Sequence, residues 1–174
     1  LENDYGVGHI MWLDDDLLRD HKRTIGMFNE MVKRGLNLTW DATNGVIASS
    51  CTDEVIAAAF ESGCIALNIG MESGNPEILK KVKKPGKVSN FLRAAEILKK
   101  YPQINARVFL IIGFPDETYR MILDTMNVPE ERKDTKRAFN VRWLSRNIQI
   151  DNKDHPRLAE ARAFITILLK RANN

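Results

Sequence analysis

The sequence predicts an α/β protein built around a sheet of about four parallel strands. Short apolar runs alternate with longer helical patterns through residues 1–127, at a spacing of roughly 25–40 residues that is typical of βαβ crossovers. Residues 108–112 are apolar throughout, as expected of a strand covered on both faces. These observations do not distinguish a barrel from an open, doubly wound sheet.

Four short runs are predicted as strands because each is rich in apolar residues and is followed by a polar or glycine-containing turn. They cover residues 8–13, 36–42, 64–69 and 107–112. Three consecutive aspartates end the first run, and Asn68 is the single polar side chain of the third.

Helices are predicted between these strands from period and end signals. Apolar side chains recur at helical spacing through residues 17–34, and Gly35 supplies the expected stop. Thr52 is expected to cap a helix over residues 55–61, and Pro76 suits the first turn of a short helix. The remaining predicted helices cover residues 89–100 and 117–126.

The last third of the chain has a different charge. The whole chain has a net charge of +3, of which residues 1–127 contribute −2 and residues 128–174 contribute +5. We therefore expect two parts: a sheet domain over 1–127 and a basic tail over 128–174. The pattern predicts a helical hairpin for the tail, with helices over 138–148 and 156–171.

Composition excludes several classes of protein. No apolar run approaches the roughly 18 residues needed to cross a bilayer, so we expect no membrane association. Cys51 and Cys64 stand thirteen positions apart, which suits neither a disulfide framework nor a metal clamp. Cys64 follows Gly63 and precedes an apolar run, so it is predicted to be a buried free thiol, which fits a reducing cytoplasm. Because the chain begins at Leu1 within an apparent element, we expect it to be part of a longer protein.

The residues after each strand are the candidates for chemistry, because ligands gather at the carboxyl ends of parallel strands. Carboxylates, hydroxyls and glycine collect there, which suits a ligand with an amine or several hydroxyls. The aspartates could instead cap a helix or hold a divalent metal, and the other residues could be ordinary turn residues. The four segments cover residues 14–16, 43–45, 70–74 and 113–118.

Four sequence motifs in order resemble the radical S-adenosylmethionine family. They are IMWLDDDLLRD, WDATNGV with CTDEVIAAAFESGC, GMESGNPEIL and IIGFPDET, spread over residues 5–127. The subgroup they resemble often carries a cobalamin-binding domain upstream. The resemblance implies a partial TIM-like barrel of parallel (βα) repeats, with cobalamin in the longer parent protein.

The resemblance also implies that seven strand-end residues bind S-adenosylmethionine. The aspartates would meet its amino group, the Glu-Ser pair its ribose or carboxylate, and the Gly-Phe-Pro run its adenine. Glu117 and Thr118 would cap the following helix, and Phe109 stands where some relatives have glycine. The seven residues are Asp14, Asp15, Glu72, Ser73, Gly113, Phe114 and Pro115.

Two departures from the family pattern limit what this chain is expected to do alone. Relatives hold a [4Fe–4S] cluster with a CxxxCxxC motif, and three thiolates are the minimum for such a site. This sequence has two cysteines, so we expect the cluster only in a longer parent chain and no radical catalysis by these residues alone. The expected sixth strand, with a PLPGTP-like end, has no counterpart after residue 127.

Two hypotheses from different classes follow. The first is a fragment of a radical S-adenosylmethionine enzyme, whose partner is the missing N-terminal part of the parent chain. The alternative is a non-catalytic scaffold or oligomerisation module that uses the tail to associate with itself. Nucleic-acid binding by the basic tail is not expected, because a charge run usually marks a solvated surface.

Overall fold

A single sheet of five parallel strands organises the protein. The computed structural model describes residues 2–84, 87–130 and 140–144. The strand order is β1-β2-β3-β4-β5, and every neighbouring pair is parallel. The strands are β1 (His9–Met11), β2 (Thr39–Val46), β3 (Cys64–Glu72), β4 (Asn105–Ile111) and β5 (Asn140–Leu144).

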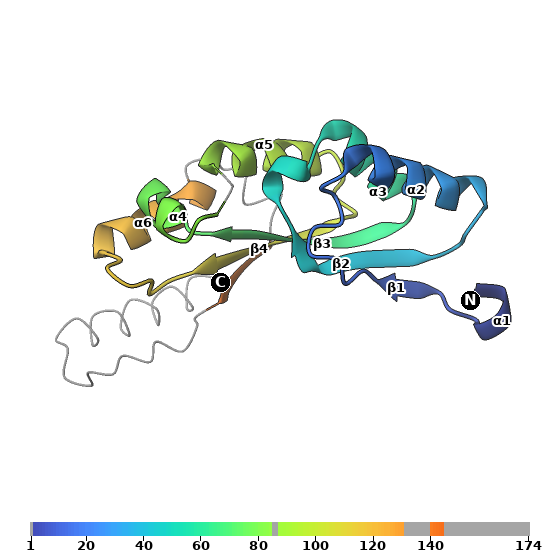
Figure 1. Ribbon diagram of the computed structural model, residues 1–174, viewed down its shortest axis with the longest axis horizontal. Coiled ribbons are helices and arrows are strands. Elements are labelled where there is room, and N and C mark those ends of the chain that lie inside the picture. The colour runs from blue at the N-terminus through green and yellow to red at the C-terminus, as the bar shows by residue number, and fades with distance from the viewer. Residues whose placement is uncertain (1, 85–86, 131–139, 145–174) are drawn as a thin grey trace.

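This strand order decides between the two sheets that the sequence left open. In a doubly wound sheet the order reverses and helices cover both faces. Here the order follows the chain, and the helices of the crossovers lie together on one face of the sheet (Figure 1). The α/β class is confirmed, and the arrangement is a sector of a (βα) barrel.

Helix ends follow local chemistry closely. The Asp20 carboxylate accepts from the Arg23 backbone N–H at 3.0 Å to start α2, and Thr52 does the same for Val55 at 3.3 Å to start α3. After α2, Gly35 has a φ of 65°, and a left-handed residue at this point closes the helix. The helices are α1 (Glu2–Tyr5), α2 (His21–Lys33), α3 (Asp53–Glu61), α4 (Pro76–Lys81), α5 (Val88–Leu98) and α6 (Tyr119–Glu130), with a 3-10 turn η1 (Ala48–Ser50).

The main hydrophobic core lies between the sheet and this helical layer. Phe28 of α2 stacks on Trp40 of β2 with ring centroids 4.7 Å apart, and both side chains are fully buried. The Trp40 indole N–H donates to the Ser62 carbonyl at 3.1 Å, so its one polar atom is satisfied inside the core. This contact fixes α2 and the end of α3 on the outer face of β2.

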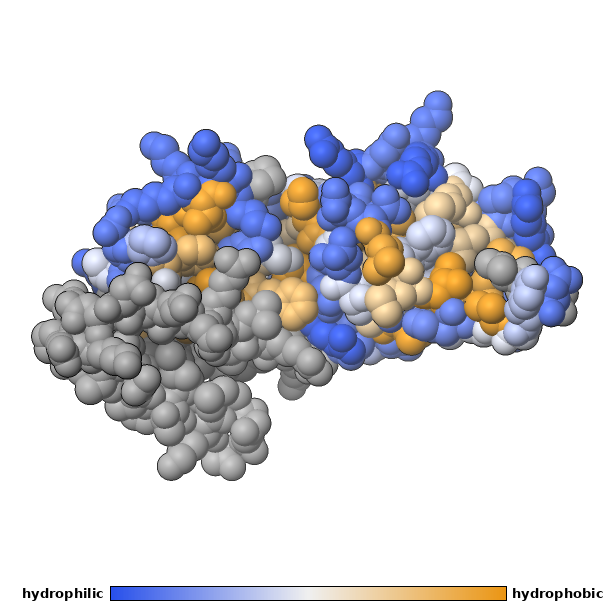
Figure 2. All heavy atoms as spheres, turned by 60° about the horizontal axis from the view of Figure 1, so that its bottom comes forward, coloured by the Kyte–Doolittle hydropathy of each residue, from blue (hydrophilic) through white to orange (hydrophobic). Residues whose placement is uncertain are grey.

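The opposite, inner face of the sheet is more polar. In β4 the side chains of Ala106, Val108 and Leu110 are buried under the helices, whereas Arg107 and Phe109 alternate with them and are half-buried on the inner face. Figure 2 brings this underside forward and shows hydrophobic patches between hydrophilic residues. In a complete barrel this face lines the interior.

The structure corrects the prediction for the start of the tail. A helix was expected over residues 138–148, but Asn140–Leu144 forms β5 and pairs with β4, with Val108 opposite Val141. The run Val-Arg-Trp alternates apolar and polar residues, which is also the period of a strand, and five residues are too few to separate the two periods. The sheet therefore continues past the boundary predicted at residue 127.

Element ends also differ from the predictions. β2 runs to Val46 instead of residue 42, and β3 runs to Glu72 instead of residue 69. Both strands contain register shifts, between Ala42 and Val46 and between Gly70 and Glu72, and such irregularities let a strand continue through glycine and polar residues. The helix predicted over 156–171 lies outside the described residues. Within the described ranges, no helix is long and apolar enough to cross a membrane.

Candidate functional site

An open pocket of about 180 Å³ lies at the carboxyl ends of β2 and β3. Four polar side chains reach it: Asp15, Asn44, Glu72 and Lys84. Glycine and apolar residues from β2, η1, β3, β4, α4 and α5 complete its lining, namely Gly45, Val46, Ile47, Ala48, Gly70, Met71, Leu79, Phe91 and Phe109. The pocket therefore offers both charges and an apolar wall at the edge where parallel sheets bind ligands.

Glu72 is the best-positioned charged group of this pocket. Its carboxylate lies 2.7 Å from the Lys84 ammonium, and its side chain is only 17% exposed. Its φ of 65° places it in the left-handed region, at the register shift that ends β3. Such a conformation is unfavourable for a residue with a side chain and is commonly found at functional sites. The strand end thus turns this carboxylate toward the pocket.

Gly70 leaves the space that this ion pair occupies. A Cβ atom at Gly70 would lie 3.1 Å from the nearer Glu72 oxygen and 3.5 Å from the Lys84 nitrogen. An alanine at this position would therefore require the Glu72 carboxylate to shift by a few tenths of an ångström. The close approach of the Glu72–Lys84 ion pair is therefore a steric reason for glycine at position 70.

The three consecutive aspartates have three different roles. Asp15 is exposed and lines the pocket. The Asp16 carboxylate accepts from the Ile47 backbone N–H at 3.3 Å and the Ser50 hydroxyl at 3.0 Å, so it ties the loop after β1 to η1. Asp14 contributes its backbone carbonyl, which accepts from the Asn44 side-chain amide at 3.1 Å.

The alternative explanations for these aspartates are not supported. The helix cap of α2 is Asp20, four residues beyond Asp16, so capping by residues 14–16 is wrong. Among the described residues, no three His, Cys, Asp or Glu side chains converge in a way that could hold a metal ion. Of the three aspartates, Asp15 lines the pocket, and contact of the Asp14 side chain with the cofactor stays a prediction.

Ser73 supports the loop after β3 and does not reach the pocket. Its side chain is fully buried, and its hydroxyl lies 2.9 Å from the Thr125 hydroxyl of α6. The Gly74 N–H donates to the same Thr125 oxygen at 2.9 Å, and the Asn75 N–H donates to Ser73 at 3.1 Å. The structure separates Ser73 from Glu72, and the hydroxyl would have to leave this network to contact a cofactor.

The Gly113–Pro115 segment forms a separate loop beyond β4. Glu117 folds back so that its carboxylate accepts from the backbone N–H groups of Gly113 at 2.6 Å and Phe114 at 3.2 Å. Burial raises the pKa of Glu117, and these two hydrogen bonds oppose the rise. None of Gly113, Phe114 and Pro115 lines the pocket, and their contact with adenine stays a prediction.

The expected capping role of this segment is only half right. The Thr118 hydroxyl accepts from the Met121 backbone N–H at 3.4 Å, which places Thr118 at the start of α6. Glu117 instead stabilises the turn after β4, since both of its hydrogen bonds go backward along the chain. Its carboxylate holds the backbone of a loop whose Gly113 has a φ of 97°.

Cys64 is a buried free thiol, as predicted, and Cys51 is one too. Burial raises the pKa of Cys51 from 9.0 to about 12, and burial also raises the pKa of Cys64. A thiolate is the form that binds iron, and burial in apolar surroundings disfavours it. Neither cysteine fits an iron–sulfur cluster.

The thiols predict a specific dependence of stability on alkaline pH. In the unfolded chain Cys51 loses its proton near its ordinary pKa of 9.0, whereas in the folded chain it keeps the proton to about pH 12. The contribution of the buried thiols to the free energy of unfolding is therefore fully present below pH 9. Above pH 9 it falls as the pH rises, by up to about 1.4 kcal/mol per pH unit for each thiol. Urea unfolding at pH 8, 9, 10 and 11 measures this slope. Cys51→Ala should make it shallower, and an unchanged slope would contradict the assignment.

Several pocket residues were not predicted individually. Asn44 lies in a segment that the sequence singled out, but Lys84 lies in a basic stretch between α4 and α5 without a recognisable motif. Lys84 reaches the pocket because α4 places the following residues over the end of β3. Charge alone did not mark this lysine, since four other lysines stand within residues 80–87.

Comparison with known proteins adds a family to this geometry. A family model described as the radical SAM superfamily matches residues 2–128. An uncharacterized methyltransferase of Pyrococcus horikoshii is 33% identical over 118 residues, which cover 68% of this chain and 25% of that protein. The ribosomal protein uS12 methylthiotransferase RimO of Proteus mirabilis is 28% identical over 66% of this chain and 26% of that protein.

Solved structures share the fold at lower identity. The radical S-adenosylmethionine methyltransferase TsrM of Kitasatospora setae, solved with cobalamin and a [4Fe–4S] cluster, superposes with a TM-score of 0.66 at 16% identity, over 80% of this chain and 28% of that one. The cobalamin-dependent S-adenosylmethionine radical enzyme OxsB gives 0.61 at 18% identity, over 74% and 20%. The chain thus spans about a quarter of the length of these relatives.

Proposed function

The chain belongs to the radical SAM superfamily, and we propose that its pocket binds S-adenosylmethionine for an enzyme that transfers methyl or methylthio groups. One observation carries this proposal. Asp15, Glu72 and Lys84, which come from three separate segments, line a single pocket at the carboxyl edge of the sheet. The transfer class is supported by the relatives, which are a methyltransferase and methylthiotransferases.

The chemistry of the pocket fits the groups of S-adenosylmethionine. This cofactor carries an ammonium, a carboxylate, two ribose hydroxyls and an aromatic base whose ring faces are apolar. Asp15 would accept from the ammonium, Lys84 would pair with the carboxylate, and Glu72 would accept from the ribose hydroxyls. Phe91 and Phe109 belong to the apolar wall that the base requires.

The ion pair between Lys84 and Glu72 can be replaced by contacts to the cofactor. Lys84 and Glu72 satisfy one another without a ligand. A cofactor with both a carboxylate and hydroxyl groups offers each partner a replacement, so neither charge is left unpaired on binding. The cofactor supplies a methyl group or, on reductive cleavage, radical chemistry.

The [4Fe–4S] cluster that the family implies does not fit the residues present. The 174-residue sequence has two cysteines, and both thiols are buried. In this proposal the cluster thiolates and any cobalamin site belong to parts of the protein outside these residues. We further propose that the protein works in a reducing cytoplasm. The interpretation that these residues are inactive by themselves belongs to the same proposal.

No observation favours the alternative of a non-catalytic scaffold. That hypothesis depends on the tail helices, and most of residues 128–174 lie outside the described part of the chain. The partner prediction, either the rest of a parent chain or a second copy, stays a prediction.

Binding of S-adenosylmethionine to the 174-residue chain tests the proposal directly. Isothermal titration calorimetry is expected to show one site in the wild type. Asp15→Ala and Glu72→Ala should each weaken binding about ten-fold, because each removes a hydrogen bond to a charged group worth about 1.5 kcal/mol.

The matched control is Glu54→Ala, an exposed carboxylate in the first turn of α3 that does not line the pocket. It should bind the cofactor like the wild type. If the wild type binds nothing, or if all three variants bind equally, this pocket is not the cofactor site.

A further inference from the structure

Two buried acceptor atoms on the inner face of the sheet have no hydrogen-bond partner among the described residues. They are Oδ1 of Asp41 in β2 and Oδ1 of Asn68 in β3. The Asn68 side chain is 3% exposed. A buried acceptor left unpaired costs about 1–3 kcal/mol, and nearly all buried polar groups in native proteins are paired. Two such atoms on neighbouring strands therefore need an explanation.

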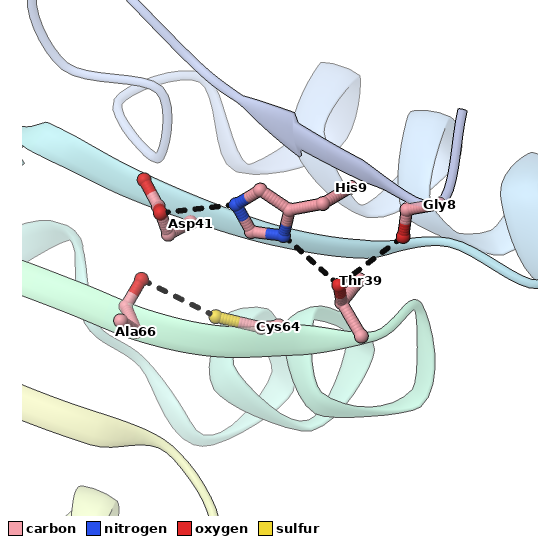
Figure 3. Close-up of polar contacts among 6 residues, drawn as sticks. All are labelled: Gly8, His9, Thr39, Asp41, Cys64 and Ala66. Carbon is pink, nitrogen blue, oxygen red and sulfur yellow. Dashed lines mark hydrogen bonds and ion pairs between the residues drawn. The ribbon is translucent and has the colours of Figure 1, made fainter. Parts of the chain in front are cut away.

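The polar groups near Asp41 do not form a hydrogen bond with its Oδ1 atom. His9 lies along β2 between Thr39 and Asp41, with Nε2 3.2 Å from Oδ2 of Asp41 and Nδ1 2.9 Å from the Thr39 hydroxyl (Figure 3). The nearby Cys64 thiol donates to the Ala66 carbonyl at 3.8 Å instead of to Asp41. The second carboxylate oxygen of Asp41 is thus held in place by its neighbours but is not paired by them.

Asn68 is fixed in the same way. Its side-chain N–H donates to the Thr43 carbonyl at 2.6 Å, which sets the orientation of the amide and leaves the oxygen pointing away from that partner. Reversing the amide would place its oxygen against the Thr43 carbonyl, acceptor against acceptor, so the orientation is not interchangeable.

Both acceptors lie on the same face of the sheet. Asp41 alternates with Trp40 and Ala42, and Asn68 alternates with Leu67 and Ile69, all four of which are in the core beneath the helices. Asp41 is the register partner of Ala66, so Asn68 stands two residues, or roughly 6.6 Å, further along the neighbouring strand. The next residue on this face of β3 is Gly70, which lines the cofactor pocket.

Asp41 already has basic groups near it, His9 in contact and Arg107 on the same face, so its negative charge does not call for a cationic ligand. Arg107 of β4 is the register partner of Asn68 and lies on the same face, and it offers one positive charge against the negative charge of Asp41. What the face lacks is hydrogen-bond donors for two oxygens. A carboxamide meets this need, because it has N–H donors, no charge, and a carbonyl that a guanidinium can bind.

We propose that Asp41 and Asn68 form a substrate subsite that binds the N–H groups of an uncharged amide, on the barrel face below the cofactor pocket. This inference rests on the proposed function in one respect: the amide belongs to the molecule presented to S-adenosylmethionine. The adjacency of Asn68 and Gly70 on one face of β3 provides the continuity between the two sites.

The test uses propionamide as the probe and N,N-dimethylpropionamide, which lacks N–H donors, as its matched control. In the ¹⁵N-labelled 174-residue chain, propionamide should shift the Asn68 side-chain signals and the backbone signals of residues 41–43, saturating at millimolar concentration. The dimethyl compound should shift them at least ten-fold less at the same concentration. This comparison needs no variant, so it holds whether or not a variant folds.

Asp41→Ala provides the second arm. It removes the free acceptor together with the rest of the carboxylate, so propionamide binding should weaken about ten-fold. S-adenosylmethionine binding should be unchanged, because Asp41 does not line the pocket. That difference separates a failure of this subsite from a failure of the proposed function.

Four results would overturn the proposal. The first is equal shifts with both amides, and the second is unchanged propionamide binding by Asp41→Ala. The third is a response to propylammonium alone, which would indicate a cation site. Absence of any saturable shift would mean that water alone pairs these oxygens, and it would also overturn the proposal.

Discussion

Replacing Gly63 with alanine is expected to lower the free energy of unfolding by at least about 3 kcal/mol. Gly63 joins α3 to β3 with a φ of 95°, a conformation that residues with a side chain rarely adopt. An added Cβ would also collide with the backbone carbonyl of Leu38, just before β2. The Gly63 carbonyl accepts from the Trp40 N–H at 2.9 Å, so relieving the collision would pull β3 away from β2.

Gly26→Ala is the matched control for this experiment. Gly26 is exposed in the middle of α2, and a Cβ there would meet nothing within 4 Å. This substitution should stabilise the protein by about 0.5–1 kcal/mol, because alanine is the better helix former. Urea denaturation of both variants measures the difference. Similar stability of the two would show that β3 does not approach Leu38 as closely as described.

The parts of the fold that the sequence predicted share one property, namely a clear local signal in the sequence. β1 to β4 and the five helices of the crossovers were each marked by an apolar run or by a helix-end residue such as Thr52 or Pro76. β5 was missed because its five residues support a helix and a strand equally well until β4 is seen beside them. β5 is a strand because it pairs with β4, which lies far from it in the sequence. The local pattern of residues carries no information about that pairing.

The candidate site was likewise predictable only where local sequence determines it. The segments near the strand ends could be located from the sequence to within a few residues, and Asp15 and Glu72 line one pocket. Which side chain at each strand end faces the ligand depends on a backbone turn, as the left-handed Glu72 and the buried Ser73 show. The position of Lys84 depends on the packing of α4, which no local pattern reports.

The Thr125 hydroxyl of α6 holds the loop that follows Glu72, and Thr125→Val is expected to remove these hydrogen bonds. The hydrogen bonds have a single consistent direction: Asn75 N–H to Ser73, Ser73 to Thr125, and Thr125 to the Met121 carbonyl at 3.1 Å. The Gly74 N–H also donates to Thr125. Valine has almost the same shape but leaves two buried donors, on Ser73 and Gly74, without an acceptor. The cost should be about 2–4 kcal/mol of stability.

The same change is expected to weaken S-adenosylmethionine binding about ten-fold at temperatures where the variant is fully folded, because the strained Glu72 turn immediately precedes the loop that Thr125 holds. Thr125→Ser keeps the hydroxyl and should recover most of the affinity, although it loses a buried methyl group. Calorimetry with the cofactor separates this effect from stability, which is measured by thermal unfolding. If serine binds the cofactor as weakly as valine, packing of α6 and not the hydrogen-bond chain positions Glu72. If valine binds as tightly as threonine, the turn at Glu72 keeps its conformation without help from α6.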